Sequence, residues 1–110
     1  KARAEAVRHA EVYRGAFAIS VCPADNIESP TIVGAQAANE LLNIVGIKAS
    51  FVLTEYQGKI YISSRSIDEI NVQLIMERVG AQLTNCTIQE AKRMIQDTID
   101  EMIKEGDIQE

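Results

Sequence analysis

Residues 49–64 read ASFVLTEYQGKIYISS. Two runs rich in β-branched and aromatic residues, 49–55 and 59–64, lie on either side of a turn that contains Gly58. Such side chains favour strands, and a glycine adopts the positive φ angle that a tight hairpin turn needs. This stretch therefore predicts an antiparallel β-hairpin, and the remaining elements are interpreted around it.

A strand and a helix precede the hairpin. The apolar run AFAISVC at residues 16–22 predicts a buried strand. Ser29 and Pro30 begin a helix of about residues 30–44, because serine caps free N–H groups and proline has none to satisfy at the first helical position. Gly46 ends this helix in a left-handed conformation. A strand, a helix and the first hairpin strand together predict a parallel crossover unit.

Two further helices follow the hairpin. Residues 66–69 (SIDE) and 87–90 (TIQE) both match the capping box that begins a helix. The second box opens an amphipathic helix whose apolar stripe we expect to pack on the sheet. The stripe consists of Ile88, Ala91, Met94, Ile95, Ile99, Met102 and Ile103. Between the two helices, residues 82–85 predict one more short strand.

These elements predict an α/β fold, with a mixed β-sheet of about four to five strands flanked by helices. The chain opens at Lys1 without a start methionine, which indicates a piece of a longer protein. We expect residues 1–14 to be a linker helix from a preceding domain, and residues 15–110 to form the domain itself.

The composition is typical of one acidic, soluble domain. The 110 residues carry a net charge of −5, and this length suffices for one core without metal or disulfide support. Cys22 and Cys86 lack the spacing of a zinc site or a disulfide framework, so we expect an intracellular protein with reduced thiols. No apolar run reaches the ~20 residues of a membrane span. The negative charge argues against broad nucleic-acid binding but leaves a local cationic contact open.

The sequence shows no self-contained catalytic centre. It has a single histidine, His9, in a polar stretch where we expect it to be solvated, and it lacks the common nucleophile, phosphate-loop and zinc motifs. One polar cluster stands out, at the end of the hairpin and directly before a predicted helix: Ser63, Ser64, Arg65 and Ser66. A strand end, a helix N-terminus and a guanidinium suit phosphate binding. A helix cap at Ser66 beside a surface arginine is the alternative.

The segment ISSRSIDEINVQLIMERVG at residues 62–80 resembles the C-terminal DHH-associated domain (subfamily 1) of the DHH phosphoesterase superfamily. It is most similar to the membrane-anchored cyclic-di-AMP phosphodiesterases of Gram-positive bacteria. Residues 37–44 (AANELLNI), 48–53 (KASFVL) and 81–85 (AQLTN) share this likeness. The resemblance extends over about residues 15–105, which is nearly the whole chain.

The resemblance implies that this chain is one lobe of a two-lobed phosphoesterase. In that family an upstream DHH domain holds two manganese ions that activate water for phosphodiester hydrolysis, and the associated domain closes over the nucleotide. The implied reaction converts cyclic di-AMP, a bacterial signalling nucleotide, into the linear dinucleotide. The implied location is cytoplasmic, in a membrane-anchored parent, and the implied partners are the upstream DHH domain and a second copy of the chain. This lobe is expected to be inactive alone.

The same resemblance implies which residues contact the substrate. The Ser-x-Arg-Ser motif of the family would contact phosphate or sugar, and two further positions would border the cleft. The residues at these positions are Ser63, Ser64, Arg65, Ser66, Asn71 and Gly80. No catalytic or metal-binding role falls on this chain.

One family feature is absent. Family members continue from the equivalent of Gly80 with four glycines and a histidine, whereas here Ala81 follows directly. Either the loop has been lost, or the 110 residues omit a mobile stretch, and the resumption of the family pattern at Ala81 favours omission. Neighbouring Cα atoms of an intact backbone are about 3.8 Å apart, so a continuous backbone at this junction argues against omission.

Three other functions stay open. The first is a short-oligonucleotide phosphodiesterase of the same superfamily, which competing hydrolysis of cyclic dinucleotide and oligonucleotides would distinguish. The second is a noncatalytic nucleic-acid-binding module, which salt-dependent binding to single strands would support. The third is a structural or dimerising domain that binds no nucleotide.

Overall fold

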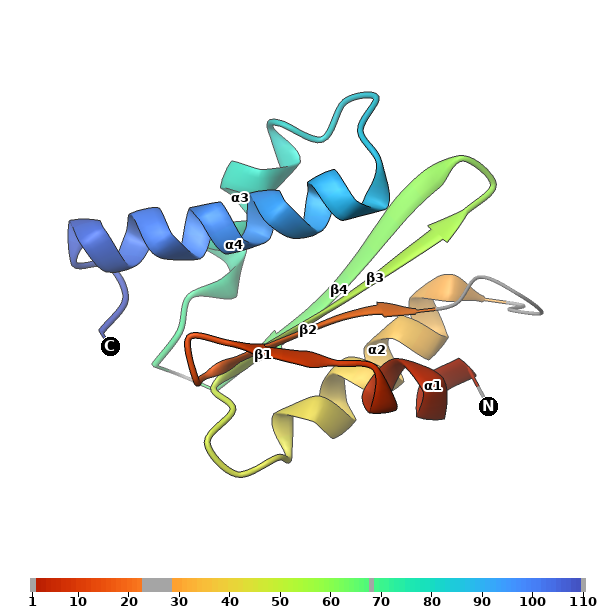
Figure 1. The fold of residues 1–110 in the computed structure, drawn as a ribbon, viewed down its shortest axis with the longest axis horizontal. Helices are drawn as coiled ribbons and strands as arrows, with labels where there is room; N and C mark the ends of the chain where they lie inside the picture. The colour runs from red at the N-terminus through yellow and green to blue at the C-terminus, as the bar shows by residue number, and fades with distance from the viewer. Residues whose placement is uncertain (1, 23–28, 68, 110) are drawn as a thin grey trace.

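The computed structural model of the chain describes residues 2–22, 29–67 and 69–109. Four strands form one mixed sheet in the order β1-β2-β3-β4, with α1 and α2 on one side and α3 and α4 on the other (Figure 1). The elements are α1 (Ala2–Arg8), β1 (Glu11–Tyr13), β2 (Phe17–Cys22), α2 (Pro30–Leu42), β3 (Ala49–Tyr56), β4 (Lys59–Ser66), α3 (Val72–Gly80) and α4 (Ile88–Glu105). The predicted α/β fold with a mixed sheet is confirmed.

The predicted hairpin is formed by β3 and β4. The two strands pair antiparallel along their whole length, from Ala49 opposite Ser66 to Tyr56 opposite Lys59. Gln57 and Gly58 make the two-residue turn, with φ angles of 51° and 77°. Positive φ at both central residues is the geometry that matches the twist of the flanking strands.

The predicted parallel unit is formed by β2, α2 and β3. β2 pairs with β3 in parallel, from Phe17 opposite Ala49 to Cys22 opposite Thr54. Pro30 begins α2 as expected, but Ser29 makes no side-chain capping hydrogen bond. Gly46 has the expected left-handed conformation, with φ of 89°.

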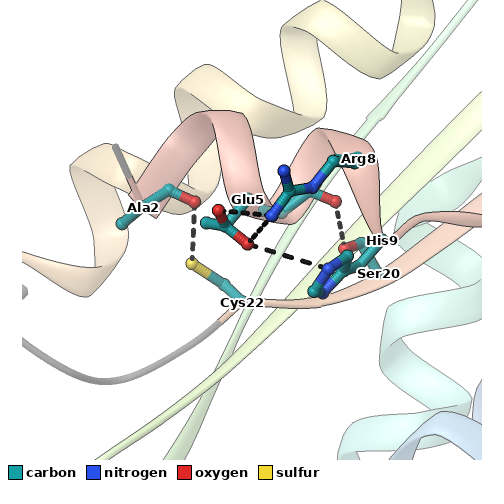
Figure 2. Close-up of polar contacts among 7 residues, drawn as sticks. Ala2, Glu5, Arg8, His9, Ser20 and Cys22 are labelled. Atoms are coloured by element: carbon teal, nitrogen blue, oxygen red, sulfur yellow. Dashed lines mark hydrogen bonds and ion pairs between the residues drawn. The ribbon is translucent and has the colours of Figure 1, made fainter.

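The N-terminal segment differs from the predicted single helix. α1 ends at Arg8, and residues 11–13 form β1, which pairs antiparallel with β2. α1 lies along β2 (Figure 2), where the buried Ser20 hydroxyl donates to the Ala6 carbonyl. The buried Cys22 thiol lies 3.8 Å from the Ala2 carbonyl, and burial raises its pKa. The division into a linker (residues 1–14) and a domain (15–110) stays a prediction.

The region after the hairpin confirms one capping box and contradicts the other. At α4, the Thr87 hydroxyl accepts from Glu90 N at 3.1 Å, and the Glu90 carboxylate accepts from Thr87 N at 2.7 Å. The apolar stripe of α4 packs against the buried cluster as predicted. The box at residues 66–69 does not form, because β4 continues through Ser66.

Residues 82–85 are not a strand. Gln82 N donates to Val79 O at 2.9 Å, which continues the turn at the end of α3. Asn85 then adopts a φ of 52°, outside the extended range. The predicted strand is therefore wrong, and β1 at residues 11–13 is the fourth strand of the sheet instead.

Candidate functional site

The four residues of the polar cluster lie on β4, an edge strand of the sheet. Residues directly opposite in an antiparallel pair point to the same face, and successive residues point to opposite faces. Ser63 and Arg65 lie opposite Val52 and Ser50, whose side chains lie under α2. Their neighbours, Ser64 and Ser66, lie opposite Phe51 and Ala49 of the cluster under α3 and α4. The cluster is therefore divided between the two faces, an alternation that the strand period of two could have revealed.

Arg65 is the cation of this site. Its Nε donates to Asn39 Oδ1 at 3.1 Å, and its Nη1 donates to Ser64 O at 2.7 Å. Both acceptors are neutral, and among residues 2–22, 29–67 and 69–109 no carboxylate pairs with Arg65. The positive charge of the guanidinium is thus held in place without being neutralised, and such a group can bind a phosphate oxygen through its remaining donors.

Ser63 lies against Gly34 of α2. A Cβ atom built on Gly34 of α2 would lie 2.6 Å from Ser63 Oγ and 3.3 Å from Ser63 Cβ. Only glycine leaves room for the serine at this distance. Ser63 and Arg65 therefore share one face with α2, a helix for which no residue of the predicted site was expected.

Ser66 and Asn71 do not lie at one helix start. Ser66 is the last residue of β4, and Ile67 N donates to Lys48 O at 3.0 Å, which extends the pairing with the β3 side. α3 begins at Val72 instead, where the Asn71 side chain accepts from Leu74 N at 3.2 Å. The helix cap at Ser66 is thus wrong, and Asn71 caps α3.

A sequence signal could have found the true start of α3. Ile70 precedes the cap and Ile75 follows it, and both are buried in the same cluster. Apolar residues at these two positions around a cap are typical of the hydrophobic staple. The staple and Asn71 indicate a helix start at residue 72, whereas the predicted box at residues 66–69 would interrupt β4.

A hollow lies beside the end of β4. It has a volume of about 400 Å³ and is lined by Lys48, Glu69, Ile70 and Gln109. Lys48 Nζ lies 3.1 Å from Glu69 Oε2. A hollow of this size lies within the range of small-molecule sites, about 300–1,000 Å³. It offers space for part of a ligand on the Ser66 side of the strand.

Gly80 lies away from the other site residues. It ends α3, nine residues after the Asn71 cap, which at the rise of a helix corresponds to about 13.5 Å. The backbone continues from Gly80 into Ala81, whose N–H donates to Glu77 O at 3.2 Å. The omission of a loop between Gly80 and Ala81 stays a prediction.

No residue set for a metal ion is found in the described parts of the chain. Within residues 2–22, 29–67 and 69–109, no three His, Cys, Asp or Glu side chains lie close enough to bind one. His9 is exposed, and its Nε2 lies 3.7 Å from Glu5 Oε2; Figure 2 shows the two side chains facing each other. In the same described residues, no helix has both the length and the apolar character to cross a membrane.

Comparison with known proteins finds a family match and several relatives. The DHHA1 domain family matches residues 15–105. The cyclic-di-AMP phosphodiesterase PdeA of Listeria monocytogenes is 38% identical over 108 residues, which cover 89% of this chain and 16% of PdeA. The cyclic-di-AMP phosphodiesterases GdpP of Bacillus subtilis and Geobacillus thermodenitrificans are 35% and 32% identical over 94% of this chain, and 18% and 17% of their own lengths.

These relatives are much longer than the matched region. The chain spans less than a fifth of the length of each of the three. The alignment to the Bacillus subtilis protein extends over 115 residues yet covers only 94% of a 110-residue chain. The relative therefore contains residues in this region that have no counterpart here, as expected where a loop is absent.

Proposed function

The chain belongs to the DHHA1 domain family, and from this membership we propose that it forms the substrate-binding lobe of a manganese-dependent phosphodiesterase. The proposed reaction is hydrolysis of cyclic di-AMP to the linear dinucleotide. In this proposal the lobe is the cytoplasmic part of a membrane-anchored parent. The named activity of three relatives, at 32–38% identity over about nine-tenths of this chain, supports the substrate class.

The observation that carries the proposal is that the Arg65 guanidinium is held by neutral acceptors. Its guanidinium is fixed by two neutral oxygens, one from Asn39 and one from Ser64. An arginine that only stabilised the surface would gain more from a carboxylate partner, whereas an anion-binding arginine must keep its charge available. We therefore assign Arg65 to the phosphodiester group of the substrate, with Ser63 beside it on the same face.

The proposal divides the work between two lobes of the parent enzyme. When bound in the parent enzyme, manganese supplies a hydroxide nucleophile and neutralises phosphate charge. In the proposal the metal is bound by an upstream DHH domain, and the described residues of this chain include no set of ligands for it. The part of this chain is to bind and orient the nucleotide, and we expect the isolated lobe not to hydrolyse it.

The test is Arg65→Ala in the full-length protein, assayed for cyclic di-AMP hydrolysis with manganese. Loss of a charged hydrogen bond to phosphate should raise KM about ten- to hundredfold. Arg93→Ala is the matched control, because Arg93 is an exposed arginine on α4, on the opposite side of the sheet. Equal kinetic constants for the two variants would overturn the assignment of Arg65.

A competition arm tests the substrate class. Unlabelled cyclic di-AMP should inhibit hydrolysis of labelled cyclic di-AMP at lower concentration than a short oligoadenylate does. If the oligonucleotide competes better and is hydrolysed faster, the protein is an oligonucleotide phosphodiesterase. If neither nucleotide binds, a structural role replaces the proposed one.

A further inference from the structure

Asn39 is joined to Arg65 across 26 positions of the chain. The side-chain oxygen of Asn39, on the exposed side of α2, accepts the hydrogen bond of Arg65 Nε at 3.1 Å. Ser64 O accepts from Nη1 at 2.7 Å. Two acceptors on different edges of a planar guanidinium fix the orientation of its plane. In the described part of the chain, Nη2 has no such acceptor.

The position of Asn39 is itself fixed by a hydrogen bond from β3 to its neighbour Ala38. Ser50 lies directly opposite Arg65 in the β3–β4 ladder. The buried Ser50 hydroxyl donates to Ala38 O at 2.7 Å, and Ala38 is the neighbour of Asn39. The links from Ser50 to Ala38, along the chain to Asn39, and across to Arg65 therefore close a ring that returns to Ser50. In such a ring the side chain of Asn39 has a defined place relative to β4.

The close approach of α2 makes this ring possible. Gly34 lies in the same helix, and Ser63 leaves no room for a Cβ atom at this position. Ala37 and Ala38, on the side of α2 that faces the sheet, are fully buried. Small residues at these positions bring the helix backbone near the strand, so that a short asparagine side chain reaches the arginine. A longer gap would require a longer side chain, with more rotamer freedom to lose.

We propose that Asn39 is a positioning residue, which holds the Arg65 guanidinium in the orientation that binds the phosphodiester group of the substrate. This inference rests on the proposed function. A free arginine loses side-chain entropy when it binds a ligand, and a pre-oriented one loses less. Asn39 therefore raises substrate affinity through Arg65, without a contact to the reacting atoms.

The proposal makes a specific kinetic prediction. In the full-length protein, Asn39→Ala should raise KM for cyclic di-AMP about fivefold and leave kcat unchanged, because a contact equally strong in ground and transition states affects KM alone. Gln36→Ala, at another exposed position of α2, is the matched control and should leave KM unchanged. Thermal unfolding of both variants should give the same Tm.

A double-mutant cycle decides whether Asn39 acts through Arg65. In an Arg65→Ala background, Asn39→Ala should have no further effect on KM, because the group that it orients is absent. Asn39→Ala should likewise leave KM unchanged in an Arg65→Lys background, since lysine lacks the Nε–H group whose hydrogen bond Asn39 accepts.

The contrary outcomes are distinct. A fivefold rise in KM that persists without Arg65 would show that Asn39 acts independently of it, and would overturn the positioning role. A lower Tm with an unchanged KM would assign Asn39 to stability alone. Either result leaves the proposed function standing as long as Arg65→Ala raises KM. If Arg65→Ala leaves KM unchanged, the assignment of Arg65 and this inference fail together.

Discussion

The two faces of the sheet are packed by side chains of different size. Under α1 and α2, half of the buried cluster is alanine: Ala6, Ala18, Cys22, Ala37, Ala38, Leu41, Ile47 and Val52. Under α3 and α4, six of the thirteen residues are isoleucine and only two are alanine: Phe17, Ile19, Ala49, Phe51, Leu53, Ile70, Ile75, Val79, Ala91, Ile95, Ile99, Met102 and Ile108. Because hydrophobic free energy grows with buried apolar area, the α3–α4 face contributes more to stability.

The small side chains of the α2 face serve another purpose. They allow the helix to approach the sheet closely enough for polar contacts, such as the bond from Ser50 to Ala38 O and the bond from Arg65 to Asn39. The candidate phosphate contact lies on this face. The comparison indicates that the face under α3 and α4 contributes most of the hydrophobic stability, while the face under α2 holds the candidate phosphate contact, Arg65.

The largest expected effect on stability tests the face of the sheet under α3 and α4. Phe51→Ala should lower the free energy of unfolding by about 3–5 kcal/mol, because it removes a fully buried ring and leaves a cavity. Val52→Ala is the matched control, since Val52 is the next residue on β3, equally buried, and faces α2. Denaturant unfolding of the two variants measures the difference. Equal losses would contradict the unequal contribution of the two faces.

A smaller effect tests the close approach of α2. Gly34→Ala should destabilise by about 1–2 kcal/mol, because the clash with Ser63 outweighs the gain of up to about 1 kcal/mol in helix propensity. Ser63→Ala in the same chain should restore part of the loss, since it removes the nearest atom, Ser63 Oγ. Gly80→Ala is the control, because nothing lies within 4 Å of its Cβ position. A loss of stability in Gly80→Ala as large as in Gly34→Ala would rule out the clash as the cause.

The smallest effect concerns the polar contact between β1 and α4. The Tyr13 hydroxyl donates to both carboxylate oxygens of Asp100, at 2.8 and 2.7 Å. This hydrogen bond to Asp100, together with burial, raises the pKa of Tyr13 above 10.0. A raised pKa in the folded state stabilises the protein below the unfolded pKa, and this contribution is lost as the pH rises through the folded pKa.

The variant Tyr13→Phe isolates this contribution. It should lower the free energy of unfolding slightly at pH 7, and the difference from the parent should shrink above about pH 10. Urea unfolding at the two pH values measures it. In an Asp100→Asn background the pH-dependent part should decrease, because the first cause of the raised pKa is removed. A difference that stays constant with pH would show that the Tyr13 proton is not linked to folding.

Much of the fold was predictable because its signals are local. The turn at Gly58, the start of α2 at Pro30 and the capping box at Thr87 each depend on residues within one or two turns of chain. The same reasoning failed at residues 82–85 and at the box of residues 66–69. At residues 66–69 the local pattern competed with strand pairing along β3, and the pairing prevailed. At residues 82–85 the chain instead continues the turn at the end of α3.

The sequence by itself determined the order of strands and helices from residue 16 to the end of the chain, apart from the strand expected at 82–85, and it identified Arg65 as a candidate phosphate contact. Only the tertiary structure decided that β1 completes the sheet, that α2 lies against Ser63, and that Asn39 accepts a hydrogen bond from Arg65. The physical reason is the sequence separation over which each interaction acts. Caps, turns and periodicity act between near neighbours, whereas the bond from Arg65 to Asn39 joins residues 26 positions apart and depends on how closely α2 packs on the sheet.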